Sequence, residues 1–394
     1  MRLCCDSTLA RLILDDIDLS NNSPDVVVVS DVYGQRGGAY RVTSLLCHAL
    51  ADCGFNATCF ATWVDLDSLT GRENFSIVQP LIKRGSRWDL PNRALAWQVQ
   101  RFVQEHNPAA VIVIGLTKVC GYLLNSRIAR QLLVWELTNA KPGNKFVDGR
   151  AAQRISRCGQ VLSPAVTIDA GIRATYGYTG PVTRMPFWIE DESIKSVPAP
   201  DKFAADFLFL ARREDDKGLR ELIHAASALQ SEFPAHRILI AGPGDETPYR
   251  KLAEQLCINN CVSFCSLPGR IDAMQTLAAS RFLVLPSYHE GYPLSLLEAA
   301  QYGVPFVATD VGSVREVFGD CEGCRIIPPR DADALAKVMK SQLLMGQSDY
   351  LNARNSVHQR FLEISSGESV RRRLQQLLAD VAGSGNRRQR DFSP

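Results

Sequence analysis

The sequence predicts an α/β protein of two domains, each built on a doubly wound parallel sheet. Three observations lead to this prediction: the length of 394 residues, a run of alternating strand and helix patterns over 26–135, and a second such run over 207–309. A chain of this length exceeds one ordinary hydrophobic core, and strands that alternate with helices are typical of parallel sheets. A hydrophobic content of 46% with 22% charged residues is that of a globular protein.

The first run begins with four consecutive valines, Val26 to Val29, which predict a strand covered on both faces. Apolar residues at helical spacing over 40–53 indicate a helix, and Gly54 is placed to cap its end. The remaining elements of this run are strands at 56–62, 111–114 and 132–135 and a helix at 92–106. Together they predict an N-terminal parallel sheet.

The second run follows a polar, proline-bearing segment that is typical of a linker. Its elements are strands at 207–211, 237–241, 262–264, 282–286 and 305–309 and helices at 219–233, 249–257, 273–279 and 294–302. The capping box Ser365-x-x-Glu368 predicts a last helix. The resulting plan is an extension (1–24), an N-terminal domain (25–190), a linker (191–202), a C-terminal domain (203–364), a helix (365–382) that is able to cross back to the N-terminal domain, and a disordered tail (383–394).

Charge and hydropathy exclude two classes of partner. The net charge of +2 gives no field that would attract nucleic acid. No stretch reaches the ~20 apolar residues of a membrane span. The first residues lack a continuous apolar signal core. We therefore expect a cytoplasmic protein without a transmembrane segment, which leaves peripheral membrane contact open.

The 12 cysteines are scattered through apolar patterns. Cys321 and Cys324 come close to metal-ligand spacing, but no histidine or second pair completes a zinc set. We expect reduced, buried thiols and no metal or other cofactor.

The segment from His289 to Ala300 is the most informative part of the chain. It lies between a predicted buried strand and a short helix, and it carries Glu290, Gly291 and Glu298. A glycine just before a helix N-terminus lets a ligand approach the backbone, whose free N–H groups and dipole favour a phosphate. Glu298, about one turn into the helix, is expected at the same end.

This segment resembles the Glu-x7-Glu signature of the family 4 retaining glycosyltransferases. Other motifs of that family follow the same order along the chain. They are the Gly-Arg…Lys-Gly loop at 211–218 with Ala211 in place of its first glycine, the Gly-x-Gly turn Gly242-Pro243-Gly244, the Gly-Gly-x-x-Glu step at Gly312 and Glu316 with Ser313 for one glycine, and an N-terminal loop Gly37-Gly38. The resemblance is strong over 205–320, thinner over 26–60 and weak over 61–204.

The resemblance implies the GT-B architecture: two Rossmann-like domains with parallel sheets that face each other across a cleft. The C-terminal domain of such enzymes binds a nucleotide diphosphate-sugar, most commonly a UDP-sugar, and the N-terminal domain binds the acceptor. The implied roles are contacts of Glu290 with the sugar, of Glu298 with the ribose, of Arg212 and Lys217 with the diphosphate, and of the backbone at Gly37, Gly38, Gly242, Gly244, Gly291, Tyr292 and Leu294 with the donor.

The implied reaction retains the anomeric configuration by a front-face route, without metal and without a glycosyl-enzyme. The leaving phosphate takes the proton of the acceptor hydroxyl. The acceptor stays unidentified, whether glycan, lipid-linked, protein or small molecule.

Two segments depart from the family pattern. Trp135-Glu136 stands where many members carry a histidine that faces the donor sugar, so Glu136 either takes over that role or begins a surface loop. Phe187 and Trp188 replace the asparagine and glycine of another step and serve either as an acceptor platform or in interdomain packing. Two alternatives to a transferase remain open: an epimerase or phosphorylase of the same fold, and a catalytically silent partner subunit.

Overall fold

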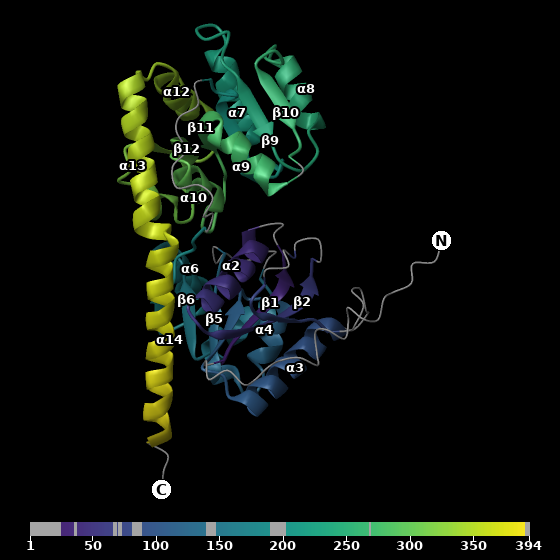
Figure 1. Ribbon diagram of the computed structural model, residues 1–394. Helices are drawn as coiled ribbons and strands as arrows, with labels where there is room; N and C mark the ends of the chain where they lie inside the picture. Colours follow the sequence, from purple (N-terminus) through teal and green to yellow (C-terminus); the bar gives the residue numbers. More distant parts are fainter. Residues whose placement is uncertain are drawn as a thin grey trace. The chain divides into compact units, whose positions relative to one another are not determined.

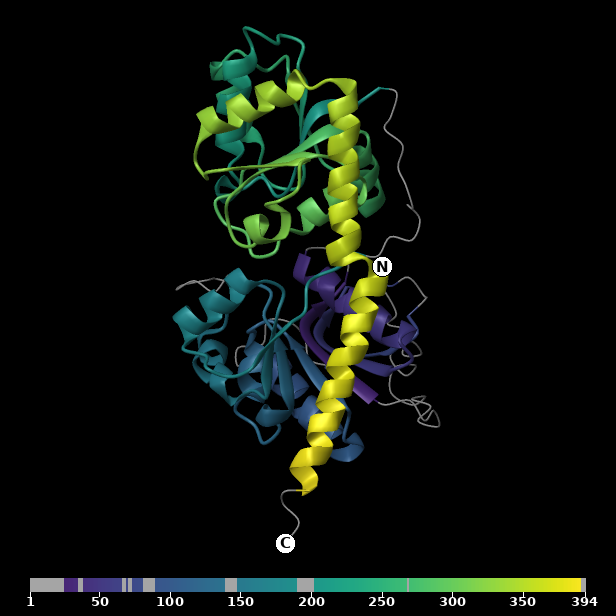
Figure 2. The ribbon, with the colours of Figure 1, turned by 90° about the vertical axis from the view of Figure 1, so that its left-hand side faces the viewer.

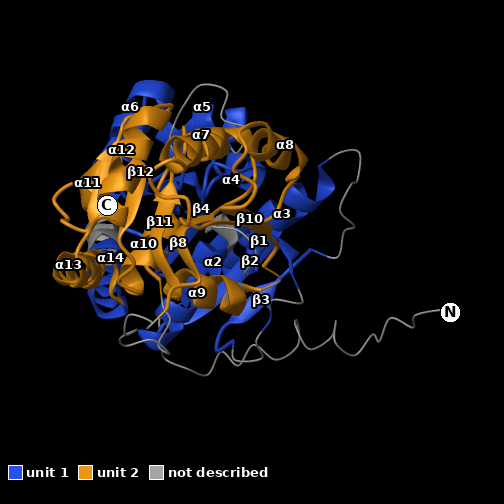
Figure 3. Cartoon of the chain, turned by 90° about the horizontal axis from the view of Figure 1, so that it is seen from above, with its two compact units in different colours: residues 1–187, 367–394 blue, residues 188–366 orange. Residues whose placement is uncertain are grey.

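The computed structural model describes residues 25–34, 38–65, 69, 73–80, 89–138, 147–189, 202–267 and 269–390. The chain divides into two compact units (Figure 3). Unit 1 comprises Met1–Phe187 and Gly367–Pro394, and unit 2 comprises Trp188–Ser366. The expected extension at 1–24 and all of the expected linker except Lys202 lie outside the described residues.

Unit 1 contains a seven-stranded sheet in the order β3-β2-β1-β4-β5-β6-β7. Strands β1, β2, β5 and β6 are labelled in Figure 1. Its strands are β1 (Asp25–Tyr33), β2 (Asn56–Val64), β3 (Ser76–Val78), β4 (Ala110–Ile114), β5 (Leu132–Trp135), β6 (Gln160–Ser163) and β7 (Val182–Arg184). Each neighbouring pair is parallel. The helices between them are α2 (Gly38–Asp52), α3 (Leu90–His106), α4 (Lys118–Leu123), α5 (Gly149–Arg154) and α6 (Val166–Tyr176).

The valine run forms the centre of this sheet, as expected for a strand covered on both faces. Val26 to Val29 are fully buried in β1, which pairs with β2 on one side and β4 on the other. The chain builds β2 and β3 on one side of β1 and then reverses direction to build β4 to β7 on the other. The loops after β1 and β4 therefore flank the point where the strand order reverses.

Unit 2 contains a six-stranded sheet in the order β10-β9-β8-β11-β12-β13. Its strands are β8 (Ala205–Leu210), β9 (Ile238–Ala241), β10 (Val262–Cys265), β11 (Ser280–Leu285), β12 (Phe306–Thr309) and β13 (Cys324–Ile327), and all of their pairings are parallel. The helices are α7 (Leu219–Leu229), α8 (Thr247–Gln255), α9 (Arg270–Ala278), α10 (Leu294–Gln301), α11 (Val314–Phe318), α12 (Ala332–Leu343) and α13 (Gln347–Ser365). Here the reversal lies between β8 and β11.

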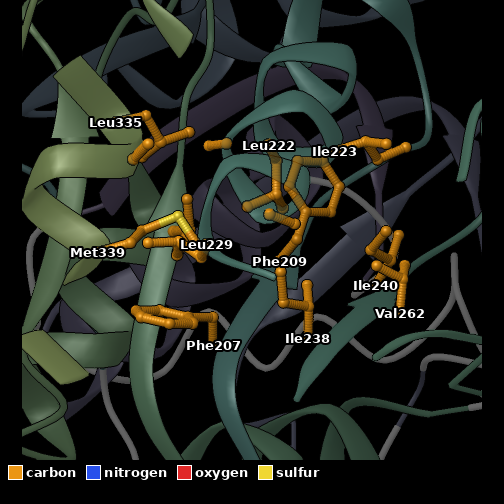
Figure 4. Packing of buried hydrophobic residues seen from close by; sticks show 14 of the residues in the cluster. Phe207, Phe209, Leu222, Ile223, Leu229, Ile238, Ile240, Val262, Leu335 and Met339 are labelled. Carbon is orange, nitrogen blue, oxygen red and sulfur yellow. The ribbon is translucent and has the colours of Figure 1, made fainter. Parts of the chain in front are cut away.

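The core of unit 2 forms where α7 and α12 cover one face of the sheet. Phe207 and Phe209 of β8 point into a cluster that includes Leu222 of α7 and Leu335 of α12 (Figure 4). Alternate residues of β8 thus share one face, as the period of a strand requires. This packing gives the loops at the carboxyl ends of β8, β9, β11 and β12 a rigid base.

The C-terminal part of the chain divides between the units. Helix α13 packs on α10 within unit 2, whereas α14 (Gly367–Arg390) belongs to unit 1 and contacts α2 and β4 (Figure 2). The predicted capping box is wrong by one residue, because Ser365 ends α13 and the extended Ser366 separates the two helices. The sequence predicted a helix ending at 382 and a disordered tail from 383, but α14 continues to Arg390. Arginine and glutamine at 387–390 favour helix, and the glycines at 383 and 385 each cost only about 1 kcal/mol.

Across the described part of the chain, no helix is both long enough and apolar enough to cross a membrane.

Candidate active site

Two loops of unit 2 carry the charged residues that the sequence singles out. The loop from β8 to α7 contains Arg212 and Lys217, and the loop from β11 to α10 contains Glu290. Since β8 and β11 are neighbours and parallel, both loops leave the same edge of the sheet. The reversal point of an open α/β sheet is where such proteins bind ligands. The structure thus brings together residues that are 73 positions apart in the chain.

Lys217 and Glu290 form an ion pair across this point. Lys217 Nζ lies 2.8 Å from Glu290 Oε1, and the two side chains are 14% and 15% exposed. Salt and water screen a pair this sheltered much less than an exposed one. The site therefore holds a cation and a carboxylate at hydrogen-bond distance from each other, a donor and an acceptor for polar groups of a ligand.

Close backbone packing holds the loops in place. Gly218 has a φ of +68°, and a Cβ there would lie 1.9 Å from the carbonyl oxygen of Pro286. Gly312 has a φ of +57°, and a Cβ there would lie 2.1 Å from the carbonyl oxygen of Glu290. Only glycine fits either position, both for its conformation and for its size. The loops after β8, β11 and β12 are thus in direct backbone contact.

Ser313 adds two hydrogen bonds to this contact. Its backbone N and its Oγ both donate to the carbonyl oxygen of Gly291, at 3.1 and 3.0 Å. Ser313 is buried and holds the segment that carries Glu290 in place. Its hydroxyl makes a hydrogen bond that a glycine at this position could not make.

The other predicted residues of this loop lie at the start of α10. Leu294 is the first residue of that helix, and Tyr292 is buried just before it. Glu298 is buried at 9% exposure and does not lie on a solvated face. The first N–H groups of a helix have no partner within it, so this end provides donors for an anion.

Two adjacent arginines in the β8–α7 loop have different environments. The side chain of Arg212 is 46% exposed and its Nη1 pairs with Glu214. The side chain of Arg213 is 2% exposed and contacts the turn that contains Gly242 and Gly244. The sequence motif selected Arg212 and missed Arg213. Both arginines precede the same three acidic residues, and nothing in the sequence shows that one is buried and the other exposed.

The unit 1 residues of the prediction occupy separate places. Gly37 lies outside the described residues, and Gly38 begins α2 after β1. Glu136 is fully buried after β5. It accepts hydrogen bonds from the backbone N of Leu116 at 3.1 Å and of Thr138 at 2.8 Å. Burial raises the pKa of its carboxyl above the usual value, and the hydrogen bonds from Thr138 and Leu116 partly oppose that shift.

Glu136 is therefore not a surface residue, contrary to one of the two roles that the sequence left open. Its carboxylate ties the loop after β4 to the loop after β5. Beside it, Trp135 Nε1 donates to the Met185 carbonyl at 3.2 Å, and the Trp135 ring centroid lies 5.2 Å from that of Phe187. Phe187 is thus a packing residue within unit 1.

Comparison with known proteins gives a partial match by sequence. Residues 190–358 match the family model of glycosyl transferases group 1. An MMP alpha-(1->4)-mannosyltransferase of Mycolicibacterium hassiacum is 30% identical over 155 residues, which is 39% of this chain. The chain spans 38% of that relative's length.

Solved structures match over most of the chain. A sucrose-phosphate synthase of Thermosynechococcus elongatus superposes with a TM-score of 0.75, at 16% identity, over 91% of this chain and 100% of that one. The fold is GT-B. HepE of Anabaena in complex with UDP has a TM-score of 0.72 at 15% identity, over 90% of this chain and 100% of the other. The GT-B fold confirms the predicted class of two parallel-sheet domains.

Proposed function

We propose that the protein is a retaining glycosyltransferase that moves a sugar from a nucleotide diphosphate-sugar to an acceptor hydroxyl. The observation that carries this proposal is the sheltered Lys217–Glu290 ion pair at the reversal point of the unit 2 sheet. It lies within residues 190–358, the part that is similar to glycosyl transferases group 1. A sugar diphosphate needs both members of such a pair: a cation for phosphate and a carboxylate for hydroxyls.

In this proposal Lys217 and Arg212 neutralise the diphosphate as its charge grows in the transition state. Fixed cations and donors of this kind are worth about 3–4 kcal/mol each when they meet developing charge. Backbone N–H groups at Gly291, Tyr292 and Leu294 add donors on the same side. Two fixed cations supply the neutralisation that a divalent metal would otherwise give, so the proposed route needs no metal.

Glu290 binds hydroxyls of the transferred sugar, and Glu298 binds the ribose diol. A carboxylate accepts two hydroxyl hydrogen bonds at once, which suits both tasks. The acceptor oxygen bonds to the anomeric carbon on the face from which the diphosphate leaves, and the leaving phosphate oxygen takes the acceptor proton. The route therefore assigns no carboxylate as nucleophile and none as base. This differs from glycoside hydrolysis, where two carboxylates divide those roles.

UDP is the proposed nucleotide, and the support is the likeness in fold to HepE of Anabaena, whose structure holds UDP. The acceptor is an alcohol of unknown class bound by unit 1. The cytoplasmic location expected from the sequence stays a prediction. Glu136, fully buried and bonded to Leu116 and Thr138, is proposed to shape the acceptor side and not to touch the sugar.

The first test is a thermal-shift screen of the full chain against UDP, GDP, ADP and their sugar conjugates. A nucleotide at 100 times its dissociation constant adds about 2.7 kcal/mol of stability. Glu298→Ala should abolish the shift. Glu254→Ala is the control, because Glu254 is an exposed glutamate of the same unit, on α8. No shift with any nucleotide, or an equal loss in both variants, contradicts the donor-site assignment.

A second test separates the reaction classes. Incubation with the stabilising nucleotide-sugar and candidate alcohols, followed by NMR of the product, should show a new glycoside with the anomeric configuration of the donor, formed equally well in EDTA. An isomerised sugar nucleotide, or release of sugar phosphate, indicates the epimerase or phosphorylase. Binding without any product across acceptors favours the silent partner.

A further inference from the structure

We propose that Arg213 is a positioning residue of the donor site, which holds the loops after β8, β9 and β10 in the arrangement that the nucleotide diphosphate requires. This inference rests on the proposed function. It concerns a residue that no motif singles out and that does not itself touch the donor.

One guanidinium bonds to two loops besides its own. Arg213 Nη1 donates to the carbonyl oxygen of Gly244 at 3.2 Å and to Glu246 Oε2 at 2.8 Å, both after β9. Arg213 Nη2 donates to the carbonyl oxygen of Cys265 at 2.8 Å and to Ser266 Oγ at 3.2 Å, at the end of β10. The planar fork of arginine reaches acceptors on two sides, which the single ammonium of lysine cannot do.

The backbone of Arg213 continues the same connection. Its N–H donates to the carbonyl oxygen of Pro243 at 2.8 Å. The position of Arg212, one residue earlier and assigned to the diphosphate, is therefore tied to the turn between Gly242 and Gly244. On the other side of β8, Lys217 reaches Glu290 after β11. Arg213 thus connects the loop after β8 to the loops after β9 and β10, whereas Lys217 connects it to the loop after β11.

The burial of this charge indicates that its partners are held firmly. The side chain of Arg213 is 2% exposed, whereas Glu246 is 33% exposed and also pairs with Arg250 at 2.7 Å. If the loops moved away from Arg213, its buried charge would be left without acceptors, which is strongly unfavourable in free energy. The guanidinium therefore restrains both loops. A site that must hold a ligand within about 0.5 Å of its productive position depends on residues that, like Arg213, fix the ligand-binding loops without touching the ligand.

The test compares Arg213→Met and Arg213→Lys with Arg250→Met as the matched control. Arg250→Met removes a guanidinium from the same Glu246 but keeps the contacts with Gly244, Cys265 and Ser266. Three quantities are measured on the full chain: melting temperature, affinity for UDP, GDP and ADP by calorimetry well below the melting point, and hydrogen–deuterium exchange over 242–246 and 263–267.

We expect Arg213→Met and Arg213→Lys to exchange faster in both segments without nucleotide, and to bind the nucleotide about tenfold to a hundredfold more weakly, the loss found when the partners that orient the ligands of a metal site are removed. Arg250→Met should match the wild type in both measurements. If Arg213→Met does not fold, Arg213→Lys carries the test, since it keeps the charge beside Glu246.

Unchanged exchange in the Arg213 variants overturns the inference. Faster exchange with unchanged nucleotide affinity also overturns it, because Arg213 would then stabilise the fold alone. If the wild type binds no nucleoside diphosphate, the proposed function fails first, and the inference fails with it. If both Arg213 variants bind the nucleotide as tightly as the wild type does, the inference fails and the proposed function stands.

Discussion

Replacing Gly312 by alanine tests whether the backbone contact beside Glu290 matters for the site. Alanine at a φ of +57° costs about 1–2 kcal/mol from the backbone conformation alone. Its Cβ would also lie 2.1 Å from the carbonyl oxygen of Glu290 and 2.7 Å from that of Gly291. For carbon and oxygen to reach van der Waals distance, the Glu290 backbone must shift by more than about 1 Å.

Gly177 provides the matched control. Its φ is +65°, and a Cβ there would meet nothing within 4 Å. Gly177→Ala should therefore lose only the conformational 1–2 kcal/mol or so and keep full transfer activity. Gly312→Ala should lose more stability and, because Glu290 moves with its carbonyl, about a hundredfold in transfer rate.

Scanning calorimetry and initial rates with a saturating acceptor measure the two effects. The reasoning is refuted if the two variants lose equal stability, or if Gly312→Ala transfers sugar at the wild-type rate. Either result would mean that the loop after β11 adapts without displacing Glu290.

Three further predictions concern ionisable groups. A double-mutant cycle with Lys217→Met and Glu290→Gln, measured by chemical unfolding, should give a coupling energy of about 1 kcal/mol. Because the pair is sheltered, 1 M salt should remove only part of this energy. Losses of stability that simply add would contradict a direct interaction between the two side chains. Burial raises the pKa of Asp31 from 3.8 to about 6. As an acid with a raised pKa in the folded state, Asp31 should cost stability of the order of 2 kcal/mol as pH rises from about 4 to 6, a slope absent in Asp31→Asn and measurable by urea unfolding. A hydrogen bond from Cys324 lowers the pKa of the buried Cys321 thiol to about 6. The ultraviolet absorbance of its thiolate, taken as the difference from Cys321→Ser, should therefore titrate with a midpoint there, and a midpoint near the ordinary value of about 8.5 would exclude the contact.

The fold could be predicted from the sequence because local patterns in buried strands have few alternatives. Four consecutive valines leave a strand no solvent face, and the strand expected at 132–135 has those bounds in the structure. Helix junctions were harder to predict. Serine is a favourable N-cap residue, so Ser365 and Ser366 are equally good candidates in the sequence. Which of them precedes α14 depends on where α13 ends, and α13 is held by its packing on α10.

The site could be predicted only in part. Motifs marked Lys217 and Glu290, but their pairing depends on β8 and β11 being neighbours, which sequence spacing does not encode. Arg212 and Arg213 have the same charge in the same loop, and only the packing of the turn after β9 decides which one is buried. Ser313 looked like the loss of a glycine, yet its hydroxyl contributes a bond to Gly291.

The division of unit 1 into two chain segments has a consequence for synthesis. Unit 2 ends at Ser366 and is complete before α14 has been translated, whereas unit 1 lacks α14 until all of unit 2 has been synthesised. At about 5–20 residues per second, α14 follows unit 2 within seconds. During that interval the surface of α2 and β4 that α14 contacts is uncovered, so unit 1 begins before unit 2 and is completed after it. A truncation after Ser366 would hold the nascent chain in that intermediate state.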